Sequence, residues 1–274
     1  MTTIANSIKS TSVSPSGIPI FVIGGIEFVH IPEGIFKMGS TEDNIVAHPN
    51  ERPQLLVYLP EYWMSRYPIT NAQYLEFCKK SGYPAYAAWE RKERTNYPAT
   101  YVTWNDAVAF CEWYNLANKE ELENAGGLRL FLPSEAEWEK AARGDDGREW
   151  PWGNESDDKN FEISGDEDKE TTPVGRYSPN EDSPYGCADM AGNVWEYTRT
   201  QFACPHTVED DLNGDLFAEI AIRGGTFRGN SKYHRCAYRD REKRNVRFKG
   251  YGFRVCLLTL EMTKKYIKQM VRLE

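Results

Sequence analysis

The sequence lacks the segments that take a chain into or across a membrane. Its first residues, 1–17, are rich in Ser, Thr and Pro and contain no apolar segment of the kind found in secretory signals. No run of eighteen apolar residues follows, so no membrane-spanning helix is predicted. We therefore expect a cytoplasmic protein with no membrane partner and with a flexible leader over residues 1–17.

Cysteine and histidine do not form the patterns of a metal or redox site. The six cysteines contain no C-x-x-C pair, and without an export signal free thiols are expected more often than disulfides. The four histidines are scattered and have no H-x-x-x-H spacing. There is also no G-x-S-x-G, P-loop or H-E-x-x-H motif, which removes support for the hydrolase, nucleotide-hydrolysing and zinc-peptidase classes.

Composition favours one soluble domain with a large aromatic core. Hydrophobic residues make up 40% of the 274 residues, and eight Trp, sixteen Tyr and twelve Phe can bury large areas. The net charge of −8 argues against binding to nucleic acid over the whole surface. We expect the domain to cover residues 18–257 and a C-terminal helical extension to cover residues 258–274.

Local patterns predict a mixture of short strands, few helices and long loops. Each expected helix begins at a capping residue, and Ser134 followed by Glu137 forms a capping box. Apolar runs broken by Gly and Pro predict short strands in the first and last thirds, with residues 54–70 expected to form a strand pair. Residues 144–186 are expected to form one long loop. The helices are expected at residues 70–81, 103–120, 134–143 and 259–272, with Thr70 or Asn71 and Thr103 or Asn105 as the first two caps.

Nine short motifs occur in one order along residues 27–256. They are FVHIPEGIFKMGS, YPITNAQYLEFC, YPATYVTWNDAVAFCEWYN, LRLFLPSEAEWEKAARG, WPWGN, TTPVGRYSPN, YGCADMAGNVWEYT, IRGGTF and GYGFRV. In this order they resemble the formylglycine-generating enzyme, or sulfatase-modifying factor, family. The resemblance implies an α+β fold, namely the irregular C-type-lectin-like fold of that family. It also admits several functions, because the family includes copper oxidases, iron-dependent sulfoxide synthases, pyoverdine-tailoring proteins and ligand-binding proteins.

The sequence departs from both oxidising classes of the family. The copper oxidases use two cysteines after their RGG motif, and soft thiolates suit Cu(I). At the position of the first, this chain has Gly229, and Cys236 matches a different, non-catalytic cysteine, so no copper is expected. The sulfoxide synthases carry iron on histidines of an additional helical domain, which the length of this chain does not accommodate. Formylglycine formation by the copper mechanism is therefore not expected.

The resemblance implies two structural calcium sites. Calcium prefers six to eight hard oxygen ligands, which carboxylates, amides and backbone carbonyls supply. One site corresponds to the stretch ADMAGNVWEY and the other to the acidic loop, where an ion would order a long segment. The alternatives are a tight turn in which Asn193 caps and Trp195 packs, and a solvated acidic loop. The implied ligands are Asp189, Gly192, Val194 and Glu196 for the first site and Asn160, Phe161, Asp166 and Asp168 for the second.

A basic segment follows at residues 223–254, with eleven Lys or Arg against two Asp or Glu. In the family this segment walls the ligand pocket, and a cationic wall attracts a carboxylate, a phosphate or an acidic protein surface. Internal hydrogen bonds are the alternative, above all for Arg223, Arg239 and Arg254. The candidate ligand-binding residues are Arg228, Asn230, Lys232, Tyr233, Arg241, Lys243 and Arg244.

Two functional hypotheses follow from these residues. The first is a ligand- or protein-binding or regulatory module for which an anionic ligand or a protein is the partner and nucleic acid is not expected. The second is a metal-dependent oxidoreductase or another modifying enzyme of the same family that acts on a peptide or a small metabolite. The C-terminal helix is expected to pack on its own domain or to dock a partner. The cysteines Cys111 and Cys256 are expected to be neighbours with reduced thiols.

Overall fold

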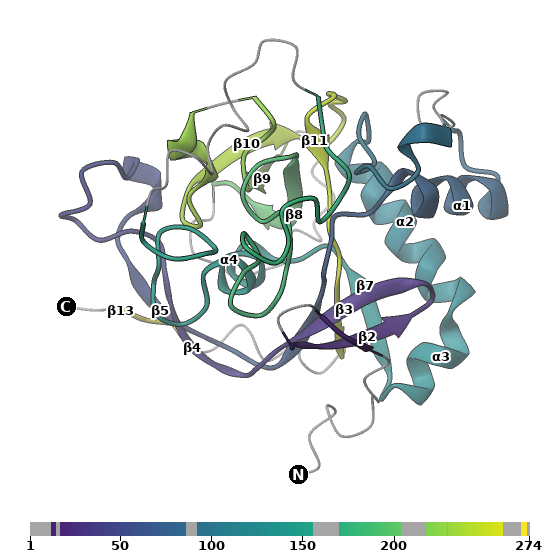
Figure 1. The fold of residues 1–274 in the computed structure, drawn as a ribbon, viewed down its shortest axis with the longest axis horizontal. Helices are drawn as coiled ribbons and strands as arrows, with labels where there is room; N and C mark the ends of the chain where they lie inside the picture. The colour runs from purple at the N-terminus through teal and green to yellow at the C-terminus, as the bar shows by residue number, and fades with distance from the viewer. Residues whose placement is uncertain are drawn as a thin grey trace.

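The computed structural model describes residues 12–14, 17–85, 92–155, 170–203, 218–228, 230–259 and 270–272. Over these residues the chain combines four α-helices with three β-sheets, which confirms the predicted α+β class (Figure 1). Long connections without helix or strand join the elements, above all in the described parts of residues 144–186. No helix in this part of the chain has the length and apolarity needed to cross a membrane.

The helices begin where the sequence places their caps. The side chains of Thr70, Thr103 and Ser134 each accept a hydrogen bond from the backbone N–H three residues later, so Thr70 and Thr103 are the caps rather than their neighbours. Gly82 ends the first helix in the left-handed conformation, which glycine adopts without strain. The helices are α1 (Asn71–Ser81), α2 (Trp104–Ala117), α3 (Lys119–Asn124) and α4 (Glu135–Arg143), with short 3-10 helices η2 (Pro49–Glu51), η4 (Lys92–Arg94) and η6 (Ser231–His234).

The largest sheet joins the two ends of the chain. Its strands lie in the order β1 (Ser12–Val13), β2 (Pro19–Ile23), β3 (Ile26–Ile31), β6 (Tyr62–Ser65), β12 (Cys256–Thr259) and β7 (Leu128–Phe131). A three-stranded sheet has the order β13 (Met270–Arg272), β5 (Leu55–Leu59) and β4 (Gly34–Met38). Because β12 pairs with both β6 and β7, the last third of the chain closes the sheet begun by the first.

The third sheet carries four of the basic residues of residues 223–254, namely Arg223, Arg239, Arg241 and Lys243. Its strands lie in the order β10 (Arg239–Lys243), β9 (Glu219–Arg223), β8 (Trp195–Gln201) and β11 (Tyr251–Gly252). β10 is the edge strand, and its antiparallel register places Lys243 opposite Glu219 and Arg241 opposite Ala221. In Figure 1 this sheet lies above α4, while α1, α2 and α3 gather at the right-hand side.

Two apolar clusters form the core. In one, α1, α2 and α3 pack against the largest sheet through aromatic side chains such as Tyr74, Phe110 and Phe253. In the other, α4 packs through Trp138 and its alanines against strands β4, β5 and β6. These buried aromatic groups explain how a chain with so many polar loops keeps a large core.

Three expectations for the outer segments need correction. Ser12–Val13 of the expected flexible leader pairs with β2 as a short strand. Residues 270–272 of the expected C-terminal helix form a strand against β5, because the edge of that strand offers unpaired backbone groups and the segment contains the β-branched Val271. The apolar runs of β5 and β6 form no pair with each other and belong to different sheets.

Candidate functional site

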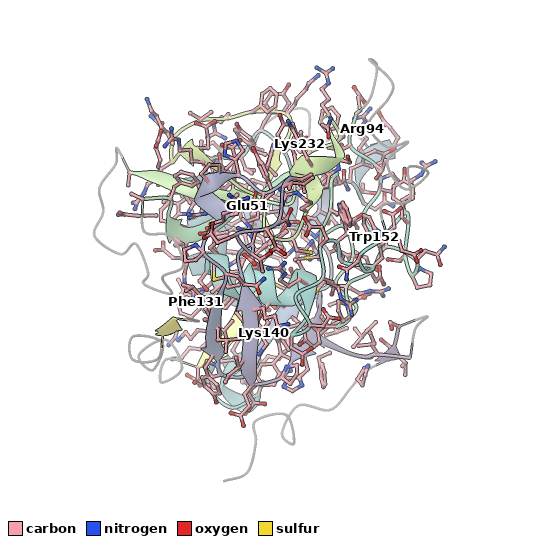
Figure 2. All side chains as sticks on the ribbon, turned by 90° about the vertical axis from the view of Figure 1, so that its left-hand side faces the viewer. Glu51, Arg94, Phe131, Lys140, Trp152 and Lys232 are labelled. Carbon is pink, nitrogen blue, oxygen red and sulfur yellow. The ribbon has the colours of Figure 1, made fainter. Side chains whose placement is uncertain are left out.

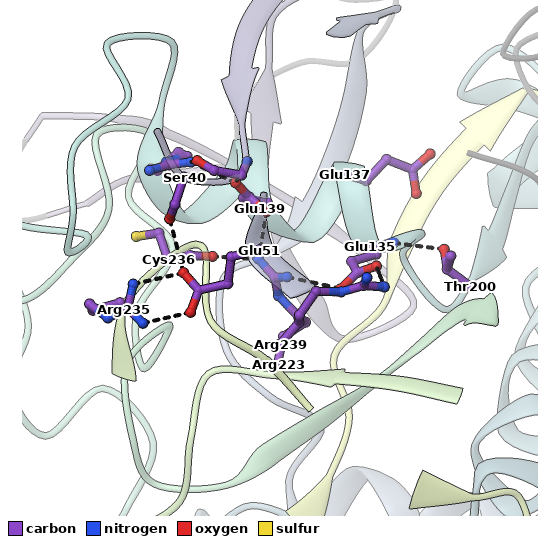
Figure 3. Close-up of polar contacts among 12 residues, drawn as sticks. Ser40, Glu51, Glu135, Glu137, Glu139, Thr200, Arg223, Arg235, Cys236 and Arg239 are labelled. Atoms are coloured by element: carbon purple, nitrogen blue, oxygen red, sulfur yellow. Dashed lines mark hydrogen bonds and ion pairs between the residues drawn. The ribbon is translucent and has the colours of Figure 1, made fainter. Parts of the chain in front are cut away.

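The glutamates of α4 anchor the arginines of the basic segment in the interior. The Glu135 carboxylate accepts two hydrogen bonds from Arg239, at 2.8 and 2.6 Å, and a third from Arg223 at 2.9 Å. Arg223 also donates to Glu139 at 2.7 Å, and Figure 3 shows these groups side by side. All four side chains are buried. Buried charges need such partners, so the internal role expected as the alternative for Arg223 and Arg239 is confirmed.

A second buried pair holds the loop before β5. Arg235 donates to both oxygens of Glu51, at 2.7 and 2.6 Å, and Ser40 donates to the same carboxylate at 2.9 Å (Figure 3). Arg235 also reaches Glu149 at 3.1 Å. In Figure 2 Glu51 lies within the body of the molecule, whereas Lys232 lies toward its upper end. This pair fixes η2 against the turn that precedes β10.

One carboxylate of the first predicted calcium site, that of Glu196, is already hydrogen-bonded to other side chains. Glu196 accepts hydrogen bonds at 2.6 and 2.8 Å from Arg254 and one at 2.6 Å from the Trp138 indole N–H. The Gly192 carbonyl accepts the Val194 N–H at 2.8 Å. These two predicted calcium ligands therefore already accept hydrogen bonds from other groups of the protein.

Asp189 is the member of that set that best suits a cation. Its backbone has a φ of 55°, and its carboxylate accepts the Gly175 N–H at 2.7 Å. Burial raises the pKa of Asp189 to about 6, and burial together with Asp189 raises the pKa of Glu181 to about 7. No group of three metal-ligating side chains is found among the described residues. The predicted set fits calcium only in part, so the site stays a prediction.

The alternative for this stretch, a tight turn held by Asn193, has direct support. Asn193 has a φ of 64°, and its side-chain amide exchanges two hydrogen bonds with the backbone of Thr172, at 3.1 and 3.3 Å. The turn thereby holds the end of the long acidic loop through Thr172. The second predicted calcium set lies outside the described residues, and its members are Asn160, Phe161, Asp166 and Asp168.

The candidate ligand-binding residues divide into three places. Arg244 is buried, with its guanidinium 4.4 Å from the centroid of the Trp104 ring, so its placement on an exposed face needs correction. Burial against an aromatic face suits a guanidinium, since its broad plane is weakly hydrated. Four residues lie around η6, namely Arg228, Asn230, Lys232 and Tyr233. The other two, Arg241 and Lys243, are exposed on β10.

The residues around η6 form an aromatic and basic turn. Asn230 caps η6 by accepting the Lys232 N–H at 3.1 Å. The Lys232 ammonium lies 5.0 Å from the centroid of Tyr233, whose ring meets Tyr238 edge-on at 5.0 Å. Arg228 is exposed at the end of the preceding turn. The four candidates therefore lie around one short 3-10 helix, and their role in binding a ligand stays a prediction.

A cavity of about 690 Å³ opens beside the edge strand β10. It receives side chains from η2, the end of β8, the start of β9 and β10, and it contains none of the four turn residues. Ala203 and Ala218 of its lining flank residues 204–217, which lie outside the described part of the chain. The lining residues are Pro49, Asn50, Arg52, Gln201, Phe202, Ala203, Ala218, Glu219, Arg239, Arg241 and Lys243.

The cavity, as lined by the described residues, is cationic. Arg239 lies at its base with its charge offset by Glu135 behind it. Arg52 donates to the Asn44 carbonyl at 2.6 Å, and its positive charge is one of the causes that lower the pKa of Asp43, which is not among the lining residues. Arg241 lies 3.3 Å from Glu219, and both side chains are about half exposed. Besides Arg239, the charged groups of the described lining are therefore Arg52, Arg241, Lys243 and one carboxylate, Glu219.

The aromatic base of the cavity was not foreseen. The guanidiniums of Arg239 and Arg241 lie 4.6 and 5.1 Å from the centroid of the Phe202 ring. Spacing in the sequence does hold one signal, because Arg239, Arg241 and Lys243 alternate along a strand and must share a face. Nothing local in the sequence connects Arg52 or Phe202 to that face, since both come from distant segments.

The described cysteines are not arranged as reactive thiolates. Cys78, Cys111, Cys187, Cys236 and Cys256 are free and buried. Burial raises the pKa of the Cys187 thiol to about 11 and that of Cys236 to about 12, and it also raises the pKa of Cys111 and Cys256. Cys111 contributes to the raised pKa of Cys256, so the two are electrostatic neighbours with free thiols, as expected.

Comparisons with known proteins agree with this geometry. A family model described as the sulfatase-modifying factor enzyme 1-like domain matches residues 25–258. The formylglycine-generating enzyme of Mus musculus is 29% identical over 293 residues, covering 83% of this chain and 74% of that protein. The inactive C-alpha-formylglycine-generating enzyme 2 of Bos taurus is 26% identical, covering 65% of this chain and 71% of that protein.

A solved structure shows the same fold. PvdO from Pseudomonas aeruginosa matches with a TM-score of 0.70 and 22% identity, covering 91% of this chain and 98% of that chain. It confirms the predicted irregular, C-type-lectin-like arrangement of short strands, few helices and long loops.

Proposed function

Because the chain belongs to the sulfatase-modifying factor enzyme 1-like family, we propose that it is a member that binds an anionic ligand instead of oxidising a cysteine. The observation that carries this proposal is the cavity beside β10, whose described lining holds the cations Arg52, Arg241 and Lys243 and one carboxylate, Glu219. A concave site with converging cations concentrates anions and gives them several charged hydrogen bonds. The family fold positions the lining residues, and the cationic side chains of the cavity bind the anion.

The cysteines support a role other than copper oxidation. Gly229 stands where the first catalytic cysteine of the copper oxidases is expected. The described thiols are buried, and their raised pKa values keep them protonated at neutral pH, whereas a Cu(I) site of that kind needs two thiolates.

The alternative is a modifying enzyme of the same family. It is favoured by the mouse relative, which is named as a formylglycine-generating enzyme, although the bovine relative is named as inactive. Metal analysis of the purified protein, together with oxygen uptake in the presence of thiol peptides, separates the two functions. Stoichiometric copper or iron with oxygen consumption would favour the enzyme and contradict the binding proposal.

Titration calorimetry tests anion binding directly. We expect inorganic phosphate, sulfate or succinate to bind at low ionic strength and to lose affinity as salt is added, because the contacts are electrostatic. The double variant Arg241→Ala/Lys243→Ala should reduce that affinity. The matched control Lys79→Ala/Lys80→Ala removes two exposed charges from α1, outside the cavity lining, and should not. The proposal fails if none of these anions binds, or if both double variants behave alike.

A further inference from the structure

We propose that the cavity beside β10 takes an organic phosphomonoester in its dianionic form. The inference rests on the proposed anion-binding function and narrows it to one head group. It starts from charge, because the described lining holds more cations than carboxylates even after Arg239 is paired with Glu135. The remaining lining charges are those of Arg52, Arg241, Lys243 and Glu219.

The charge balance favours a ligand with two negative charges. With Arg239 paired to Glu135, the described lining residues carry three cations against one carboxylate, an excess of two positive charges. A phosphomonoester carries about −1.5 to −2 charges near pH 7, since its second pKa is about 6. A monocarboxylate would leave one of those charges unmatched. The phosphomonoester thus neutralises the cavity with a single group.

The donors converge from two elements. Arg241 and Lys243 are two positions apart on one face of β10, which separates their Cα atoms by about 7 Å. Arg52 approaches from the end of η2 and is held there by its bond to the Asn44 carbonyl. A tetrahedral group with three terminal oxygens can accept from guanidinium forks and an ammonium together. A linear dicarboxylate would have to divide its charges between the strand and η2.

The rest of the cavity suits an apolar body. Phe202, Ala203, Ala218 and Pro49 line it beside the cations. A phosphate group alone would leave much of about 690 Å³ unfilled, and ligand sites are commonly apolar with a few fixed polar groups. Phe202 is already covered by two guanidiniums, so the body packs next to these stacked groups. Phenyl phosphate has this combination of a dianionic head and an apolar ring.

Calorimetry with phenyl phosphate, benzoate and succinate tests the head group. At pH 7.5 we expect phenyl phosphate to bind at least about tenfold more tightly than either carboxylate, since it places two charges on one group. Between pH 5.5 and 7.5 its affinity should rise about fourfold, following the fraction of dianion. Glu219 is the described lining carboxylate that could also titrate, so the Glu219→Gln variant should retain this pH dependence.

Single substitutions locate the site. Arg241→Gln should weaken phenyl phosphate binding about tenfold, while Arg176→Gln removes an exposed arginine outside the cavity lining and should leave binding unchanged. A phosphotyrosine peptide presents the same head group. Tighter binding of the peptide would indicate a phosphorylated protein as its source, and tighter binding of phenyl phosphate would indicate a small metabolite.

The outcomes separate this inference from the proposed function. Equal or tighter binding of succinate or benzoate would overturn the phosphomonoester assignment while leaving anion binding intact. Phenyl phosphate binding that is insensitive to Arg241→Gln would overturn the assignment to this cavity. Failure of every anion to bind would remove the proposed function itself.

Discussion

Arg254 holds Glu196 in the interior through two hydrogen bonds, from Nε to Oε2 at 2.6 Å and from Nη2 to Oε1 at 2.8 Å. Both side chains are almost fully buried, and the Arg254 guanidinium also donates to the carbonyls of Ser65, Arg66 and Ala188. One arginine therefore ties the start of β8 to the loop after β6 and to the turn around Asp189. The pair is a structural centre of the domain.

Neutralising Glu196 should strongly destabilise the fold. In Glu196→Gln the Arg254 charge stays buried without its carboxylate, which typically costs about 3–5 kcal/mol. Glu242→Gln is the matched control, because Glu242 is only half-buried and accepts hydrogen bonds from the Tyr251 hydroxyl at 2.7 Å and from the Lys243 N–H at 2.8 Å, with no buried arginine among these partners. Its cost should be about 1 kcal/mol. Chemical denaturation of both variants measures the difference, and similar losses would show that the buried pair is not a centre of stability.

The calcium prediction at the turn is tested through Asp189. If a calcium ion binds there, calcium should raise the Tm of the wild-type protein and a chelator should reverse the gain. Asp189→Asn should abolish this response, because the Asp189 carboxylate accepts a hydrogen bond from the Gly175 N–H and pairs with no arginine among the described residues, whereas Glu196 is engaged by Arg254 and Trp138. A wild-type Tm that responds to neither reagent would leave the stretch as the tight turn that Asn193 builds.

Lys140 should make stability depend on alkaline pH. Its ammonium donates to the carbonyls of Pro32 and Gly34 at 2.6 and 3.1 Å, and burial lowers its pKa from 10.5 to about 8. Between these two values the unfolded chain binds more protons than the folded protein, so stability rises with pH. The full effect is on the order of 3 kcal/mol, because each unit of pKa shift corresponds to about 1.4 kcal/mol.

Denaturation at pH 7.5 and pH 10 checks this dependence. The wild-type protein should gain stability relative to Lys140→Met over that interval, because the variant has no ammonium to deprotonate. Lys79→Met alters an exposed lysine and serves as the control, with no such relative gain expected. Parallel pH curves for the wild type and Lys140→Met would contradict the lowered pKa.

Glu219 should compete with an anionic ligand for Arg241. It lies 3.3 Å from the Arg241 Nε and opposite Lys243 in the strand register. Glu219→Gln should therefore increase the affinity for phenyl phosphate, by roughly threefold to tenfold, since a charged competitor is removed. Asp240→Asn is the charge-matched control on the same strand, outside the cavity lining. An equal gain in the control would indicate a general effect of net charge.

Local sequence signals predicted the elements that depend on near neighbours. The caps Thr70, Thr103 and Ser134 each bond a group three residues away, so the sequence alone places the starts of α1, α2 and α4. The strand over Met270–Arg272 was mistaken for helix. Its partner β5 lies about two hundred residues earlier, and helical spacing carries no information about an unpaired strand edge.

The candidate site was predicted only in part for the same reason. The alternation of Arg239, Arg241 and Lys243 along one strand is written in the sequence, and so is the absence of a cysteine at Gly229. The tertiary structure alone decided that Arg239 turns inward to Glu135, that Arg244 stacks on Trp104, and that Arg52 and Phe202 complete a cavity. A sequence specifies which groups carry charge. Contacts between distant segments form only when the chain packs. These contacts decide which charges are neutralised in the interior and which face a ligand.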